Sequence, residues 1–124
     1  MYSFFVYICA MKNQNSILKG SLNIILLKLL EENGAMYGYE ICQKVKKMTD
    51  NGIQITEGAL YPALHKLEME GIITFYLQEI EGRTRKYYTL TPEGGSVVQD
   101  RISEFLEAIK NVENILSLNL KPSI

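Results

Sequence analysis

One part of this chain has the spacing of β-strands, whereas the segments on both sides of it have the spacing of helices. After Gly71 the segments ITFYLQEI and RKYYTL alternate in hydrophobicity, are rich in aromatic and β-branched residues, and flank a turn around Gly82. This pattern predicts a β-hairpin over residues 73–90. The fold class is therefore expected to be mainly α with a small β-hairpin, an α+β fold.

Three helices are expected before the hairpin. The first begins near Ser16, has apolar residues at i, i+4, i+7, i+8 and i+11 counted from Leu18, and ends at Asn33-Gly34. The second begins within the segment YGYE at residues 37–40 and ends at the turn of residues 50–52.

The third helix follows residues 53–55, which alternate as a very short strand would. Thr56 can cap this helix, because its hydroxyl can accept a hydrogen bond from a free N–H of the first turn. One face of the helix is apolar and is expected to pack into the core. That face holds Leu60, Leu64 and Leu67.

A long final helix is expected from Thr91-Pro92-Glu93, because Thr caps, Pro fits the first helical position and Glu favours the positive end of the helix dipole. Its apolar residues are separated by 4, 3, 4, 3 and 4 positions, which is the seam of a coiled coil. We expect this seam to join two copies in a homodimer, while packing within one chain is the alternative. The predicted interface residues are Val98, Ile102, Phe105, Ile109, Val112 and Leu116.

Three helices followed by a hairpin form a winged helix-turn-helix, whose third helix is offered to the major groove of DNA. We therefore expect a winged helix-turn-helix domain over residues 11–91 and a dimerisation helix with its tail over residues 92–124. Residues 1–10 are either a genuine extension or lie ahead of a true start at Met11.

Four segments make a more specific pattern: LKGSLNIILLKLL, YGYEI, EGALYPALHKLEMEGII and RKYYTLTPEG, in this order over residues 18–94. Together they resemble the PadR family of bacterial transcriptional regulators, and the short C-terminal part resembles the branch in which a single helix makes the homodimer. The resemblance implies a dimeric DNA-binding repressor.

In several members of that family, a small aromatic or cationic molecule bound near the dimer interface lowers the affinity for DNA. The wide apolar seam of the final helix suggests Phe105, Ile109 and Val112 as the place for such an effector, and a repressor without a ligand is the alternative. The chain has no Trp, so the tryptophan stacking cage of a drug-binding relative is missing.

Gly58 and Pro62 weaken the start of the third helix, which suggests that this region serves contact with DNA; the alternative is that Pro62 only shapes packing. Without a side chain, Gly58 lets a phosphate or a base edge approach the backbone. Arg, Asn and Gln are absent from residues 56–71, so we expect modest sequence discrimination by this helix. The contacts predicted from it are Thr56, Gly58, Ala59, Tyr61, Pro62 and Lys66.

Two further regions are expected near DNA. The hairpin tip carries three cations, with a shape suited to a minor groove, or it is merely a solvated turn. At the start of the second helix, one of two tyrosines is expected to donate to phosphate, with burial in the core as the alternative, and one lysine of that helix is expected to approach DNA. These residues are Arg83, Arg85, Lys86, Tyr37, Tyr39 and Lys44.

Composition limits the other functions. The net charge of -1 gives no general attraction to nucleic acid, although the acid surplus lies in the C-terminal part. No apolar run approaches the roughly 20 residues of a membrane span. Cys9, Cys42 and the single His65 form no metal-ligand pattern, so we expect ordinary thiols, a cytoplasmic location and no metal or cofactor. No catalytic constellation is found, which argues against an enzyme. A winged-helix module that binds another protein instead of DNA is the alternative function.

Overall fold

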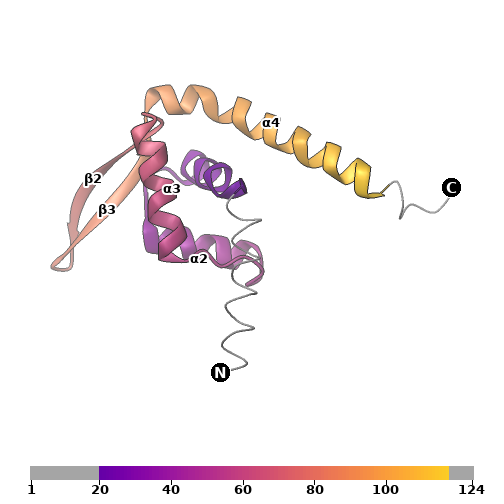
Figure 1. Cartoon of the computed structure of the whole chain (residues 1–124). Helices are drawn as coiled ribbons and strands as arrows, with labels where there is room; N and C mark the ends of the chain where they lie inside the picture. Colours follow the sequence, from indigo (N-terminus) through magenta and orange to yellow (C-terminus); the bar gives the residue numbers. More distant parts are fainter. Residues whose placement is uncertain (1–19, 118–124) are drawn as a thin grey trace.

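The helices and the hairpin of the structure follow the predicted order, whereas the short strands do not (Figure 1). The computed structural model describes residues 20–117. It contains a first helix over residues 20–33, β1 (Met36–Tyr37), α2 (Gly38–Met48), α3 (Glu57–Met69), β2 (Ile73–Ile80), β3 (Arg83–Leu90) and α4 (Pro92–Ser117). The predicted helix start near Ser16 and the extension at residues 1–10 lie outside the described residues. The α+β winged helix-turn-helix is confirmed.

The predicted hairpin consists of β2 and β3, which pair antiparallel from Ile73 opposite Leu90 to Ile80 opposite Arg83. Its turn residues, Glu81 and Gly82, have φ values of 51° and 77°. Positive φ at both positions is the mark of the two-residue turn whose twist matches that of paired strands. The hairpin is therefore specified locally.

The short strand expected at residues 53–55 is absent, and that prediction was wrong. The Ile53 N–H donates to the Thr49 hydroxyl at 2.9 Å, and Ile55 is buried, so the alternation reflects packing of a connecting segment. The third strand is instead β1, which pairs with Tyr87 and Tyr88 of β3. Within residues 20–117 the sheet order is β1-β3-β2.

The core is formed by apolar residues of every element from the first helix to the start of α4. The three leucines predicted for the inner face of α3 are at most 1% exposed. From the first helix, the predicted Leu22, Leu26 and Leu29 are buried, together with Leu27 and Leu30. The burial of these last two shows that this helix is covered on more than one side.

The joint between the winged domain and α4 is a backbone contact. The Ile72 carbonyl accepts hydrogen bonds from the Thr91 N–H at 3.0 Å and from the Thr91 hydroxyl at 3.1 Å. The same hydroxyl accepts from the Gly94 N–H at 2.9 Å, which confirms the predicted cap. From this joint α4 extends away from the other helices (Figure 1). None of the helices in residues 20–117 combines the length and apolar character of a bilayer span.

The two glycines in the first turn of α4 should respond oppositely to alanine. A Cβ at Gly94 would collide with the Ile72 carbonyl, which Thr91 holds in place, whereas a Cβ at Gly95 would meet open space. We expect Gly94→Ala to lower the free energy of unfolding by about 3 kcal/mol or to prevent folding. Gly95→Ala should raise it by roughly 0.5–1 kcal/mol. Urea unfolding followed by circular dichroism measures both. Equal effects of the two variants would contradict this account of the joint.

Candidate nucleic-acid interface

The outward side of α3 is held in place by its buried side. The Thr56 hydroxyl accepts from the Ala59 N–H at 3.3 Å, as predicted for the cap. Because the inner leucines are fully buried, Gly58, Pro62 and Lys66 face solvent, and a Cβ added at Gly58 would meet only the Thr56 hydroxyl, at 3.9 Å. The start of α3 is therefore open to a ligand. Ala59 is only partly exposed.

The two residues that weaken this helix are four positions apart. A proline removes the hydrogen bond to the carbonyl four residues earlier and crowds that carbonyl. Here the carbonyl belongs to Gly58, so Pro62 leaves that carbonyl without its partner four residues on. Contact with DNA at this place stays a prediction, and so does the alternative that Pro62 only shapes packing.

Tyr61 is half exposed, but its hydroxyl is turned toward the start of α2. A Cβ at Gly38 would lie 2.6 Å from the Tyr61 hydroxyl oxygen, so glycine is what allows this approach. Partial burial, and then the nearby Glu57 carboxylate, raise the pKa of Tyr61. The Tyr61 hydroxyl therefore lies at the joint between α2 and α3, and the predicted contact of Tyr61 with DNA stays a prediction.

The three cations of the hairpin do not form one cluster. Arg85 and Lys86 are neighbours on β3 and so project from opposite faces of the sheet. The Arg85 guanidinium lies 4.5 Å from the centre of the Tyr37 ring, and the Lys86 ammonium lies 3.8 Å from the centre of the Phe75 ring. Arg83 is exposed at the start of β3, next to the turn. Only two of these three cations can therefore share a face of the hairpin.

The sequence did not predict a group of tyrosines, one of which, Tyr37, contacts Arg85. Tyr37 meets Tyr87 edge-on at 5.4 Å between ring centres, Tyr87 stacks on Tyr76 at 5.5 Å, and Tyr39 lies 6.3 Å from Tyr37. Tyr39 is 64% exposed, so it is not buried in the core, which was the alternative to contact with phosphate. The group depends on the pairing of β1 with β3, which spacing within either segment cannot reveal.

Lys44 and Tyr37 keep their predicted places on α2 and at its start. Lys44 is exposed on the helix. Tyr37 precedes the helix, and its N–H donates to the Glu40 carboxylate at 3.1 Å, which satisfies a free donor of the first turn. The contact of either residue with DNA stays a prediction.

The seam of α4 becomes more exposed from its first member to its last. Val98 is fully buried in the chain's own core, so its side chain does not lie on the exposed part of the seam. Ile102 and Phe105 are partly buried, whereas Ile109, Val112 and Leu116 are between 44% and 62% exposed. An apolar stripe of this length on a protruding helix is a typical interaction surface.

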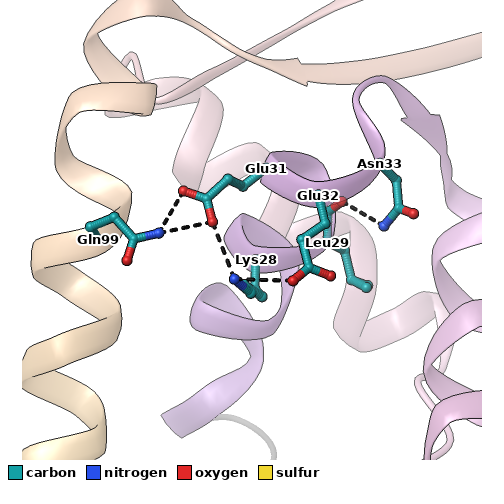
Figure 2. Close-up of polar contacts among 6 residues, drawn as sticks. All are labelled: Lys28, Leu29, Glu31, Glu32, Asn33 and Gln99. Atoms are coloured by element: carbon teal, nitrogen blue, oxygen red, sulfur yellow. Dashed lines mark hydrogen bonds and ion pairs between the residues drawn. The ribbon is translucent and has the colours of Figure 1, made fainter.

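Polar contacts fix α4 against the first helix (Figure 2). The Gln99 amide donates to both oxygens of the Glu31 carboxylate, at 2.8 and 3.0 Å. Lys28 contacts Glu31 at 3.4 Å and Glu32 at 3.1 Å. The hydrogen bond from Gln99 is the main reason that the pKa of Glu31 lies below its usual value, and Lys28 adds to the shift.

A second polar contact joins α4 to α3. The Arg101 guanidinium lies 3.4 Å from the carboxylate of Glu70, the residue that ends α3. Beside it, a shallow depression of about 370 Å³ separates the first helix from α4. Gly20, Asn23, Ile24, Arg101, Glu104 and Phe105 line it. Of the three residues predicted for an effector, only Phe105 contributes to this depression.

An exposed third helix beside a β-hairpin, with an apolar helix leaving the domain, defines a winged-helix regulator. Residues 26–100 match the model of the PadR-like family of transcriptional regulators, and the chain belongs to this family. Its fold is similar to that of a transcriptional regulator from Clostridium thermocellum, with a TM-score of 0.71, 38% identity, and 80% of this chain and 95% of that chain covered.

Two further relatives agree with this assignment. A PadR family transcriptional regulator from Eggerthella lenta superposes with a TM-score of 0.68 at 25% identity, covering 94% of this chain and 97% of that one. The transcriptional regulator Rv3488 of Mycobacterium tuberculosis is 33% identical over 57 residues, which are 45% of this chain and 53% of that protein. The predicted family is confirmed.

The contact between Gln99 and Glu31 should be visible in acid titration. Gln99→Leu removes the main donor, so the pKa of Glu31 should rise toward its ordinary value while Lys28 keeps it somewhat low. The pKa of Glu31 is lower in the folded than in the unfolded protein. Its contact therefore stabilises the folded state above a pH of about 4.3, and this stabilisation is lost as the pH falls through the pKa of the folded protein. NMR titration of the Glu31 carboxyl measures this change. Asn111→Leu, on an exposed position of the same helix, is the control, and an unchanged pKa in Gln99→Leu would refute the contact.

Proposed function

We propose that this chain is a cytoplasmic, homodimeric repressor that binds a pseudo-palindromic site on double-stranded DNA. The observation that carries the proposal is that α3 has one buried and one exposed side. Its leucines fix it in the core, whereas Gly58 and Lys66 on the other side are exposed to solvent, and within residues 20–117 a Cβ added at Gly58 would meet only the Thr56 hydroxyl. Helices presented in this way lie in the major groove, with the hairpin beside them. As a repressor, the protein would act by covering DNA that other proteins need.

The charges suit phosphate contact more than the net charge implies. Lys44, Lys66 and Arg83 are exposed and make no ion pair within residues 20–117. Lys86 is also exposed, and its ammonium lies over Phe75 and over Tyr88, which is buried in the core, so it lies on the side of the sheet that faces the core helices. Lys66 on α3 and Lys86 on this side of the sheet thus offer exposed positive charge, while the acidic surplus lies on α4.

Regulation has two forms within this proposal. A small aromatic molecule could bind in the depression at Phe105 and extend along Ile109 and Val112, changing how two copies of α4 pack and so the spacing of the reading helices. The aromatic wall at Phe105 supports this form. A repressor without a ligand is the other form, and the absence of Trp weakens the case for a flat drug.

DNA binding is tested by selecting bound fragments from random duplexes and then titrating the winner with salt. We expect two half-sites with centres about 34 Å apart, one turn of the double helix. If Lys44, Lys66 and Arg83 of two protomers each neutralise one phosphate, affinity should fall about 10³-fold between 50 and 200 mM salt. A winged-helix module for protein binding would select no fragment, and binding independent of salt would contradict the proposed contacts.

Gly58→Ala separates folding from DNA contact in the same assay. The added Cβ meets no backbone, so the helix should gain about 0.5–1 kcal/mol of stability. DNA affinity should nevertheless fall by about tenfold, the worth of one charge-assisted hydrogen bond. Gly95→Ala, a helical glycine far from this surface in the sequence, serves as the control. Unchanged DNA affinity in Gly58→Ala would show that DNA does not approach the backbone there.

Dimerisation is tested by placing a charge on the α4 seam. Ile109 is 44% exposed, and Ile109→Asp would put a carboxylate into a dimer interface. We expect sedimentation to show a dimer for the wild type and, for this variant, a dissociation constant raised by about 100-fold or more. Asn111→Asp, which lies off the seam, should remain dimeric. A wild-type protein that sediments as a monomer at micromolar concentration would overturn the homodimer.

A further inference from the structure

We propose that His65 reads a purine base in each half-site and is the main specificity-determining residue of α3. The inference rests on the DNA binding proposed above. It starts from spacing, because helices in the major groove present side chains at i, i+3, i+4 and i+7 to the bases. On the outward side of α3 these positions are Gly58, Tyr61, Pro62 and His65, all exposed.

Three of these four positions cannot read a base through a side-chain hydrogen bond. Gly58 has no side chain, and the ring of Pro62 has neither donor nor acceptor. The hydroxyl of Tyr61 is turned against Gly38. His65 is the remaining member of the set, and it makes no hydrogen bond or ion pair within residues 20–117. Its imidazole is therefore free to meet a partner outside the chain.

Two charged residues of α3, Glu57 and Lys66, are not placed to read a base. Glu57 lies close enough to Cys42 and Tyr61 to raise the pKa of both, so its carboxylate lies on the side of α3 next to α2. Lys66 is exposed and flanks the outward side, where an ammonium is suited to phosphate as a point charge. A phosphate contact positions a protein on DNA and carries no sequence information.

The chemistry of imidazole selects the kind of base. A neutral imidazole offers one N–H donor and one nitrogen acceptor. In the major groove, guanine presents two acceptors at N7 and O6, and adenine presents an acceptor at N7 beside the donor at N6. The donor of His65 matches the N7 that both purines share. One purine position per half-site should therefore depend on His65.

The test compares the full-length wild type with His65→Ala, His65→Gln and Lys66→Ala in selection from random duplexes. Loss of one good base contact should weaken binding of His65→Ala to the wild-type site by about 5- to 150-fold. The preference should vanish at one symmetric pair of positions, and the salt dependence should not change. His65→Gln should turn that position toward adenine, because Gln pairs with N6 and N7. Lys66→Ala should weaken all sequences alike and lower the salt slope by about one per protomer.

The outcomes separate this inference from the proposed function. If the wild type selects a site and His65→Ala keeps the same base preferences, the inference is wrong while DNA binding stands. If His65→Ala instead weakens all sequences equally and reduces the salt slope, His65 contacts phosphate and the inference is also wrong. If the wild type selects no duplex, both the inference and the proposed function fail. Circular dichroism of each variant checks that this exposed position leaves the fold intact.

Discussion

The structure depends on the burial of one side of α3. Leu60, Leu64 and Leu67 are fully buried, and fixing them fixes the direction in which every other residue of the helix points. A Pro inside a helix would normally be a serious weakness. Here the three buried leucines anchor the helix in the core despite that weakness.

Local signals in the sequence were sufficient for the helices, the caps and the hairpin. Thr56 and Thr91 were predicted as caps, and their hydroxyls accept hydrogen bonds from the Ala59 and Gly94 N–H groups, because a cap involves residues within one turn. The turn at Gly82 was equally local. The strand β1 was missed, and a strand at residues 53–55 was expected wrongly, because two-residue pairing depends on which segments meet in space.

The contacts of the predicted site residues were only partly foreseeable, and their role in binding DNA stays a prediction. The sequence indicated the exposed positions of α3, but it treated Arg83, Arg85 and Lys86 as one cluster although alternation along a strand already separates the last two. Val98 fitted the heptad seam and is nevertheless part of the core, since the first turns of α4 still lie against the winged domain. The tyrosine contacts near Arg85 can be predicted only when the strand register is known. The place of the Tyr61 hydroxyl can be predicted only when the position of Gly38 is known.

The joint at Gly94 has a consequence for the geometry of the assembly. The backbone of α4 rests directly on the Ile72 carbonyl, and Gln99 and Arg101 then tie the next turns to the first helix and to the end of α3. These contacts together fix the angle between α4 and the winged domain. In the proposed dimer, this angle would set the distance between the two winged domains. A change of a few degrees at the joint would move the far end of α4 by much more than the joint itself. The spacing of the two DNA half-sites would therefore depend on the close contact at Gly94.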